Sequence, residues 1–296
     1  MDFEFDDTRL LDYTDAELIG YLHTLPSLEP SAVWLLSSKY LAKRYRAEDF
    51  DDAVQSLVFA SQLRISVPRI RRMICNKRFS YCIMDVIPGQ TLEVAWPDLG
   101  WVASLRLAFQ LRQIVGRLRT AKSVSSGSLM TGQCRSYYLD DLFGLPPRAS
   151  SQQMNAFLNF WANLRHPRYE VIKTPAEHAI CQKPIFSSSG PFVFTHHDLA
   201  PRNIILDGKG KLWLIDWDLA GFYPAFFEHA GMHNFIEAGW STFALWRWKV
   251  FAWIAGGFYR TECRWLKVIR SRITLWQVAR RFNIKANGGR KRGKVV

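Results

Sequence analysis

The chain has 296 residues, of which 48% are hydrophobic and 12 are Trp. This composition excludes an intrinsically disordered protein and is compatible with one large domain or two. Its 39 Lys and Arg outnumber 26 Asp and Glu, so the net charge is +13. Because no nucleic-acid-binding motif accompanies this charge, we expect no specific nucleic acid partner.

The cysteines and the most apolar stretch favour a cytoplasmic protein. The five cysteines are odd in number and lack short paired spacings, which indicates reduced, buried thiols; they are Cys75, Cys82, Cys134, Cys181 and Cys263. The acidic start has no apolar segment and does not resemble a signal peptide. Residues 243–259 are apolar but few for a membrane span and include Arg247 and Lys249. We expect a cytoplasmic monomer with no membrane partner.

The first part of the chain is expected to combine short strands with helices. Prolines end the first helix, and acidic residues crowd the first turn of the second, as the helix dipole prefers. A turn at Ser37-Ser38 separates the first two strands. In chain order we expect a helix within 1–30, strands at 31–36 and 40–45, a helix at 48–64, and a hairpin of strands at 70–75 and 79–86.

The remainder is expected to be mostly helical. Apolar residues recur at helical spacing along residues 101–122, and the last part of the chain is rich in aromatic residues that we expect to be mainly core. Further helices are expected at 152–164 and 175–182, with two or three more within 229–282. A basic tail at 285–296 completes the chain.

The stretch from residue 193 to residue 218 carries the strongest chemical pattern. Asp198 follows His196 by two positions and precedes Asn203 by five. Two apolar runs, 204–206 and 212–215, flank an Asp-Gly-Lys-Gly turn and predict a hairpin that returns Asp216 beside the loop. A divalent metal with phosphate ligands prefers hard oxygen donors, which Asn203 and Asp216 supply. Asp198 is then left to accept a proton from an attacking hydroxyl group.

This stretch resembles the aminoglycoside phosphotransferase and choline kinase group of kinase-like enzymes, in which the catalytic loop reads His-x-Asp-x-x-x-x-Asn. His196, Asp198 and Asn203 match that loop without a gap. The amino-acid sequence of the loop is most similar to that of fungal-type members, and Ile-Asp-Trp-Asp at 215–218 resembles their Ile-Asp-Trp-Glu. The resemblance covers roughly residues 31–260 and implies ATP-dependent phosphorylation of a hydroxyl group on a small metabolite or antibiotic-like acceptor, with Mg²⁺.

The resemblance also implies an α+β fold of two lobes, like that of protein kinases. Residues 1–88 would form an N-lobe with a small antiparallel sheet, and residues 89–284 a mostly helical C-lobe. Met84, Asp85 and Val86 lie at the boundary, where the backbone of related enzymes hydrogen-bonds adenine.

The family pattern implies a role for each matching residue. Asp198 would be the catalytic base, and Asn203 and Asp216 would bind Mg²⁺. Lys43, inside the second strand, would bind nucleotide phosphates, with Lys39 and Arg44 as rivals for that role. For the remaining matches, His196 would brace the loop, His197 would be non-catalytic, Glu228 would be structural, and Arg202 would either pair with Asp218 or contact phosphate.

Two departures from the family leave alternatives open. The glutamate that pairs with the strand lysine in kinases falls at Gln55, or at Asp52 if the helix is shifted by a turn. No glycine-rich loop separates the first two strands, where only Ser37-Ser38 stands. These departures favour the alternative of a catalytically inactive, nucleotide-binding pseudokinase. A protein kinase ranks low, because Trp217-Asp218 follows the metal-binding aspartate in place of Phe-Gly.

Overall fold

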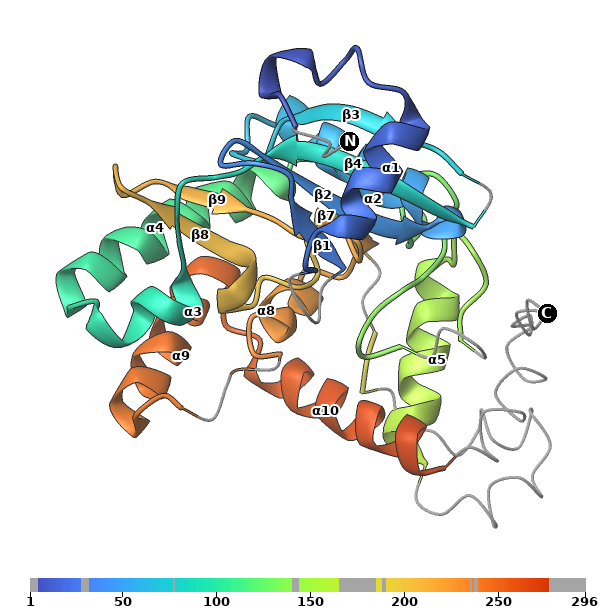
Figure 1. Ribbon diagram of the computed structural model, residues 1–296. Helices are drawn as coiled ribbons and strands as arrows, with labels where there is room; N and C mark the ends of the chain where they lie inside the picture. The colour runs from blue at the N-terminus through green and yellow to red at the C-terminus, as the bar shows by residue number, and fades with distance from the viewer. Residues whose placement is uncertain are drawn as a thin grey trace. The chain divides into compact units, whose positions relative to one another are not determined.

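The computed structural model of the chain describes residues 5–27, 32–76, 78–139, 144–164, 185–187, 190–234, 236 and 239–276. The chain divides into two compact units (Figure 1). The first unit comprises Met1–Ala95 and Arg202–Asp218, and the second comprises Trp96–Pro201 and Leu219–Val296. The first unit thus includes the predicted hairpin, and the lobe boundary at residue 88 stays a prediction. The expected helix at 175–182, Cys181 and the tail at 285–296 lie outside the described residues.

The first unit is built around a four-stranded antiparallel sheet in the order β1-β2-β4-β3. Two helices accompany it (Figure 1), namely α1 (Asp15–Thr24) and α2 (Ala47–Gln62). The strands are β1 (Val33–Leu35), β2 (Tyr40–Arg46), β3 (Ile70–Ile74) and β4 (Phe79–Asp85). These elements confirm the strands, the helix at 48–64 and the hairpin that the sequence predicted, within a few residues at each end.

The two faces of this sheet pack against different helices. Tyr81 and Ile83 belong to the apolar cluster that includes α1, whereas Cys82 and Met84 belong to the cluster that includes α2. Successive side chains of a strand point to opposite faces, so this alternation is expected. Lys43 of β2 lies directly opposite Cys82 in the antiparallel register. Because directly opposite residues share a face, Lys43 lies on the α2 face of the sheet.

A second sheet of the first unit contains the predicted hairpin. Its order is β5-β8-β9, all antiparallel, with β5 (Gly89–Thr91), β8 (Ile204–Asp207) and β9 (Leu212–Leu214). The carboxylate of Asp207 accepts hydrogen bonds from the backbone N–H groups of Lys209 and Lys211, each at 2.9 Å. This turn confirms the hairpin. The partner strand β5 and the short helix α3 (Leu92–Ala95) were not predicted.

The second unit combines a small sheet with the long helices. The sheet runs β10-β7-β6, with β6 (Lys122–Ser123), β7 (Phe192–Thr195) and β10 (Gly221–Tyr223). Helix α4 contacts α9, and α5 contacts α10 (Figure 1). The helices are α4 (Trp101–Leu118), α5 (Ser151–Asn163), α8 (Phe226–Gly231), α9 (Thr242–Gly256) and α10 (Arg260–Leu275). Within the described residues, no helix combines the length and the apolar character that crossing a membrane demands.

Two expectations about burial hold only in part. The four cysteines in the described residues are free, and Cys82, Cys134 and Cys263 are buried, but Cys75 is exposed. The aromatic residues of α9 divide in the same way. Trp248 and Phe251 are buried, whereas Trp246 and Trp253 remain about half exposed. The C-terminal aromatic residues are therefore not all core, because α9 turns one aromatic face to the protein and another to solvent.

Candidate functional site

Lys43, Asp216 and Asp218 form a group of charges in the first unit, here called the lysine cluster. The Lys43 Nζ donates to Asp216 Oδ1 at 2.6 Å and to Asp218 Oδ1 at 2.9 Å. It also lies 4.9 Å from the centroid of the Tyr45 ring, within reach of a cation–π interaction. The lysine side chain is only 14% exposed, whereas the two carboxylate side chains are 40% and 39% exposed. The cluster therefore joins a mostly buried cation to two carboxylates that water reaches.

The three charges shift one another's pKa values. Burial disfavours the ammonium form of Lys43, but the two carboxylates outweigh burial, and the pKa of Lys43 is raised. Removal from water and the neighbouring Asp216 raise the pKa of Asp218 to about 7, while Lys43 acts in the opposite direction. A proton on Asp218 is therefore held only loosely near neutral pH. An additional cation at the cluster would displace it.

The hairpin β8–β9 brings Asn203 and Asp216 together. Asn203 ends a short 3-10 helix, Pro201–Asn203, and its carbonyl accepts a hydrogen bond from the Ile215 N–H at 3.1 Å. Asp216 then takes a left-handed backbone conformation with φ of 66°, which Asp tolerates better than most residues. The next residue, Trp217, is buried, and its indole N–H donates to the Leu214 carbonyl at 3.2 Å. This anchored tryptophan fixes the turn that carries the two aspartates.

These residues fit a magnesium ion bound together with phosphate. Asp216, Asp218 and Asn203 offer two carboxylates and an amide oxygen, the hard donors that Mg²⁺ prefers. The Lys43 ammonium group already lies against both carboxylates, which shows that a cation is favoured there. In the part of the chain that the structure describes, no three His, Cys, Asp or Glu side chains form a group able to hold a metal by themselves. Magnesium characteristically takes its remaining ligands from substrate phosphates and water.

A different polar group, here called the glutamate brace, shapes the loop that follows β7 in the second unit. The Glu228 carboxylate accepts the backbone N–H groups of His196 at 2.8 Å and His197 at 3.0 Å. Glu228 is 1% exposed, and burial raises its pKa to about 7 although both hydrogen bonds act to lower it. The Glu228 side chain thus holds the loop backbone.

His197 is packed as a structural residue of the same loop. It has a left-handed φ of 74°, its Nε2 lies 2.6 Å from the Ser136 hydroxyl, and its ring lies against Tyr223 and Phe227. Burial lowers the pKa of His197 to about 3, so the ring is neutral at physiological pH. Gly231 of α8 approaches so closely that a Cβ there would lie 2.5 Å from the His197 carbonyl oxygen.

The same loop carries the predicted base. Asp198 is half buried, and its backbone N–H donates to His196 Nδ1 at 3.4 Å. Asp198 belongs to the second compact unit, whereas Asn203 and Asp216 belong to the first. The three residues of the predicted catalytic motif are therefore distributed over both units.

The structure does not bring the expected helix partner to Lys43. Gln55 is exposed on α2, while Asp52 is buried on the same helix. Within the described residues, Lys43 hydrogen-bonds to neither of them and instead bonds to the two aspartates after β9. The role of Asp218 as a partner of Lys43 was not predicted. The sequence signal for this role is that Asp218 lies two residues after Asp216. The two carboxylates flank Trp217, which the structure shows to be buried.

The two rival cations occupy other positions. The Arg44 guanidinium lies 5.4 Å from the centroid of the Trp34 ring and 4.8 Å from that of Phe79. The Lys39 ammonium pairs with Asp7 at 3.4 Å. Among the three cations considered for the phosphate role, Lys43 is therefore the one that contacts the predicted metal-binding aspartate.

The predicted adenine-binding segment is engaged in the sheet. Met84 is buried in β4, opposite Leu41. The Asp85 N–H donates to the Arg69 carbonyl at 3.0 Å, and the Val86 N–H donates to the Lys39 carbonyl at 2.8 Å. Two of the backbone donors in this segment thus already have acceptors within the first unit.

Comparison with known proteins adds to this geometry. A model of the phosphotransferase enzyme family matches residues 25–258. The aminoglycoside phosphotransferase APH(3'')-Id from Streptomyces rimosus, in complex with ADP and streptomycin, is similar at 16% identity over 92% of this chain and 99% of that one, with a TM-score of 0.51. A second structure of that phosphotransferase gives 15% identity, the same coverage and a TM-score of 0.51. No curated protein matches the chain. At these identities the likeness shows the fold, which is the two-lobed, kinase-like α+β fold that the sequence predicted.

Proposed function

Because this chain belongs to the phosphotransferase enzyme family, we propose that it transfers the γ-phosphate of ATP to a hydroxyl group of a small-molecule acceptor, with Mg²⁺. The observation that carries the proposal is the lysine cluster, in which the predicted phosphate-binding Lys43 contacts the predicted metal-binding Asp216 at 2.6 Å. That contact joins residues 173 positions apart in the chain. The finer likeness to fungal-type members stays a prediction.

Lys43 and the two aspartates would bind the charged end of the nucleotide. Bound magnesium would neutralise charge on the β- and γ-phosphates. Asp216 and Asn203 are the residues proposed to hold it, with Asp218 as a further carboxylate near them. Lys43 would exchange its ion pairs with the aspartates for contacts to phosphate oxygens. The exchange keeps the mostly buried ammonium group paired, because phosphate oxygens replace the carboxylates as its counter-charge.

Asp198 is proposed as the base that accepts the proton of the acceptor hydroxyl. Phosphoryl transfer asks the protein mainly to position groups and to neutralise charge. The glutamate brace and the packing of His197 fix the loop backbone on which Asp198 stands. His196 supports the same loop through its Nδ1, which accepts the Asp198 N–H.

The backbone of Met84, Asp85 and Val86 is still proposed to receive the adenine, although the N–H groups of Asp85 and Val86 already have acceptors within the first unit. Support for nucleotide use comes from the similar Streptomyces rimosus phosphotransferase, which was obtained with ADP and streptomycin. Gln55 was included among the nucleotide-binding residues in the sequence analysis. Its exposure on α2 makes it the weakest of them.

An ATP thermal-shift titration with and without Mg²⁺, followed by an acceptor screen, tests the proposal. We expect ATP to raise the unfolding temperature, and to do so more strongly with Mg²⁺. Asp198→Asn should abolish transfer to any acceptor found and leave Mg²⁺-ATP binding nearly intact. If Asp198→Asn lost nucleotide affinity to the same extent as activity, Asp198 would be a metal ligand. Binding without turnover on any acceptor would instead favour the pseudokinase.

A further inference from the structure

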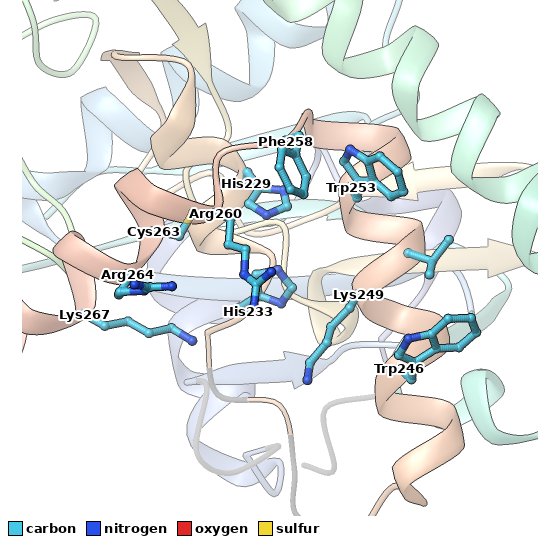
Figure 2. A pocket seen from close by; sticks show the side chains of 11 residues that line it. His229, His233, Trp246, Lys249, Trp253, Phe258, Arg260, Cys263, Arg264 and Lys267 are labelled. Carbon is cyan, nitrogen blue, oxygen red and sulfur yellow. The ribbon is translucent and has the colours of Figure 1, made fainter.

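A pocket in the helical part of the second unit contains none of the residues assigned above. It is formed by α8, α9 and α10 and the segments that join them, and its volume is about 690 Å³. That size is typical of pockets for small organic ligands. Figure 2 shows the side chains that line it, with those of α9 and α10 on its two sides. We call it the α9–α10 pocket.

The charge of the α9–α10 pocket has one sign. Arg260, Arg264 and Lys267 line it from α10, at the i, i+4 and i+7 spacing of one helix face, and Lys249 lines it from α9. Among the described residues that line the pocket there is no Asp or Glu. In Figure 2 the charged ends of Arg260, Lys267 and Lys249 extend from the two helices toward one another. Such a concentration of positive charge in a concave site attracts anions.

This arrangement opposes the stability of the helix that carries it. Like charges at i and i+4 repel, and a cation in the first turn of a helix faces the positive end of its dipole. Arg260 is the first residue of α10. Within the described ranges, none of the four charged side chains has a hydrogen bond or an ion pair with another residue. Among the described residues, these side chains therefore lack a directly bonded counter-charge, which a bound anion would supply.

The same pocket has an aromatic wall. Trp253 and Phe258 contact each other with ring centroids 5.4 Å apart, and they are 51% and 66% exposed. Trp246, 54% exposed, lines the pocket further along α9. Large aromatic side chains are normally buried, and their exposure in a concave site marks a surface that an apolar ligand would cover.

Metal binding and thiol chemistry do not explain the pocket. His229, His233 and Cys263 line it, but the described residues contain no group of three such side chains able to hold a metal. Burial raises the pKa of Cys263 to about 12, so the thiol is not a nucleophile at neutral pH. Burial, with His229 and the two lysines, lowers the pKa of His233 to about 3. The histidines are therefore neutral, and the charge of the pocket is that of its lysines and arginines.

We propose that the α9–α10 pocket binds a small organic anion that carries an aromatic ring. Its carboxylate, sulfonate or phosphate group pairs with Arg260, Arg264, Lys267 and Lys249. Its ring covers the exposed faces of Trp253 and Phe258. The arginines offer paired N–H donors that match the oxygen atoms of such groups.

Calorimetric titration of the full chain with three ligands of the same ring system and different charge tests the proposal. Naphthoate should bind, naphthylmethanol should bind at least about tenfold more weakly, and naphthylmethylamine should not bind. Added salt should weaken naphthoate binding. Equal affinity for the anion and the neutral alcohol would overturn the proposal. The titration uses neither ATP nor an acceptor, so its result is independent of phosphoryl transfer.

Substitutions locate the site. Arg264→Glu and Lys267→Glu should each weaken naphthoate binding by about tenfold or more, since each replaces an attractive charge with a repulsive one. Both residues are exposed, so the fold should be retained, which thermal unfolding would verify. Lys122→Glu makes the same charge change on β6, outside the pocket, and should leave binding unchanged. If Lys122→Glu weakened binding as much as the other two, the anion would be responding only to net charge.

Discussion

The lysine cluster and the glutamate brace are both polar groups built around carboxylates, but they differ in their access to water and in their partners. In the lysine cluster, two carboxylates about 40% exposed share one ammonium group. In the brace, a carboxylate that is 1% exposed holds two backbone N–H groups. Carboxylates that water reaches can change partners without losing all of their hydration, whereas a buried N–H that loses its acceptor is costly. The lysine cluster is therefore suited to exchange partners, and the brace to hold a loop.

The largest expected effect comes from Asp216→Asn, which removes one charge from the lysine cluster. Asn also tolerates the left-handed conformation found at this position. We expect kcat/KM for ATP to fall by about a thousandfold, or about 4 kcal/mol of transition-state stabilisation, and Mg²⁺ to lose its effect on ATP affinity. Because Asp218 remains as a partner of the mostly buried Lys43, the free energy of unfolding should fall by less than the roughly 3 kcal/mol expected when a buried ion pair is broken. Steady-state kinetics and denaturant unfolding measure the two quantities separately.

Asp207→Asn is the matched control on the same hairpin. Asp207 accepts hydrogen bonds from Lys209, Lys211 and the Trp213 indole, so its replacement should cost stability. The kinetics should remain close to those of the unmodified chain. A comparable loss of activity in Asp207→Asn would mean that Asp216→Asn acts through the hairpin and not through the charge.

Glu228→Ala should have the opposite signature. It leaves the N–H groups of His196 and His197 without their acceptor in a buried site, and we expect a loss of about 3 kcal/mol in the free energy of unfolding. Glu228→Gln retains one acceptor oxygen and should lose less. Denaturant titration gives both values. If Glu228→Ala kept its free energy of unfolding but lost activity, the glutamate brace would have a catalytic role. The contrast between the brace and the lysine cluster would then fail.

His197→Phe tests, through pH, the side-chain packing of the loop that the brace holds. It keeps an aromatic ring against Tyr223 and Phe227 but loses the contact with Ser136, so we expect it to be about 2 kcal/mol less stable at neutral pH. The pKa of His197 is lowered in the folded state, from 6.5 to about 3. Its contribution is therefore fully present above pH 6.5 and is lost as the pH falls toward 3. The stability gap between the two proteins should shrink over that range, as pH-dependent thermal unfolding would measure. A constant gap would mean that His197 titrates normally.

Much of the first unit could be predicted because its signals are local. The prolines that end the first helix, the acidic start of α2 and the Asp-Gly-Lys-Gly turn are each signals within a few residues, and each element formed where the sequence placed it. The sheet β10-β7-β6 was missed. Its strands have two to four residues, and they pair across gaps of up to about 70 residues of chain. Periodicity within a single segment carries no information about such pairings.

The site shows the same limit. The hairpin predicted after Asn203 was enough to predict that Asp216 returns beside Asn203. The partner of Lys43 was not predictable, because the carboxylates that it contacts lie 173 and 175 residues further along the chain. The family pattern suggested a partner on the neighbouring helix, at Gln55 or Asp52. The structure instead shows two aspartates that flank a buried tryptophan.

The smallest expected effect tests whether Lys43 pairs with Asp216 and Asp218 and not with a residue of α2. Gln55 was the family-based candidate to contact Lys43, but it is exposed on α2. Gln55→Glu should therefore change the free energy of unfolding by less than about 0.5 kcal/mol. It should change the affinity for ATP by less than about twofold. Asp52→Asn alters a buried carboxylate of the same helix and should have the larger effect of the two. Thermal unfolding and ATP titration of both variants give the comparison. A tighter affinity for ATP in Gln55→Glu would mean that Lys43 leaves Asp216 and Asp218 for α2 when nucleotide binds. The lysine cluster would then be one of two arrangements of Lys43. The movement of Lys43 between these carboxylates would be the property that catalysis uses.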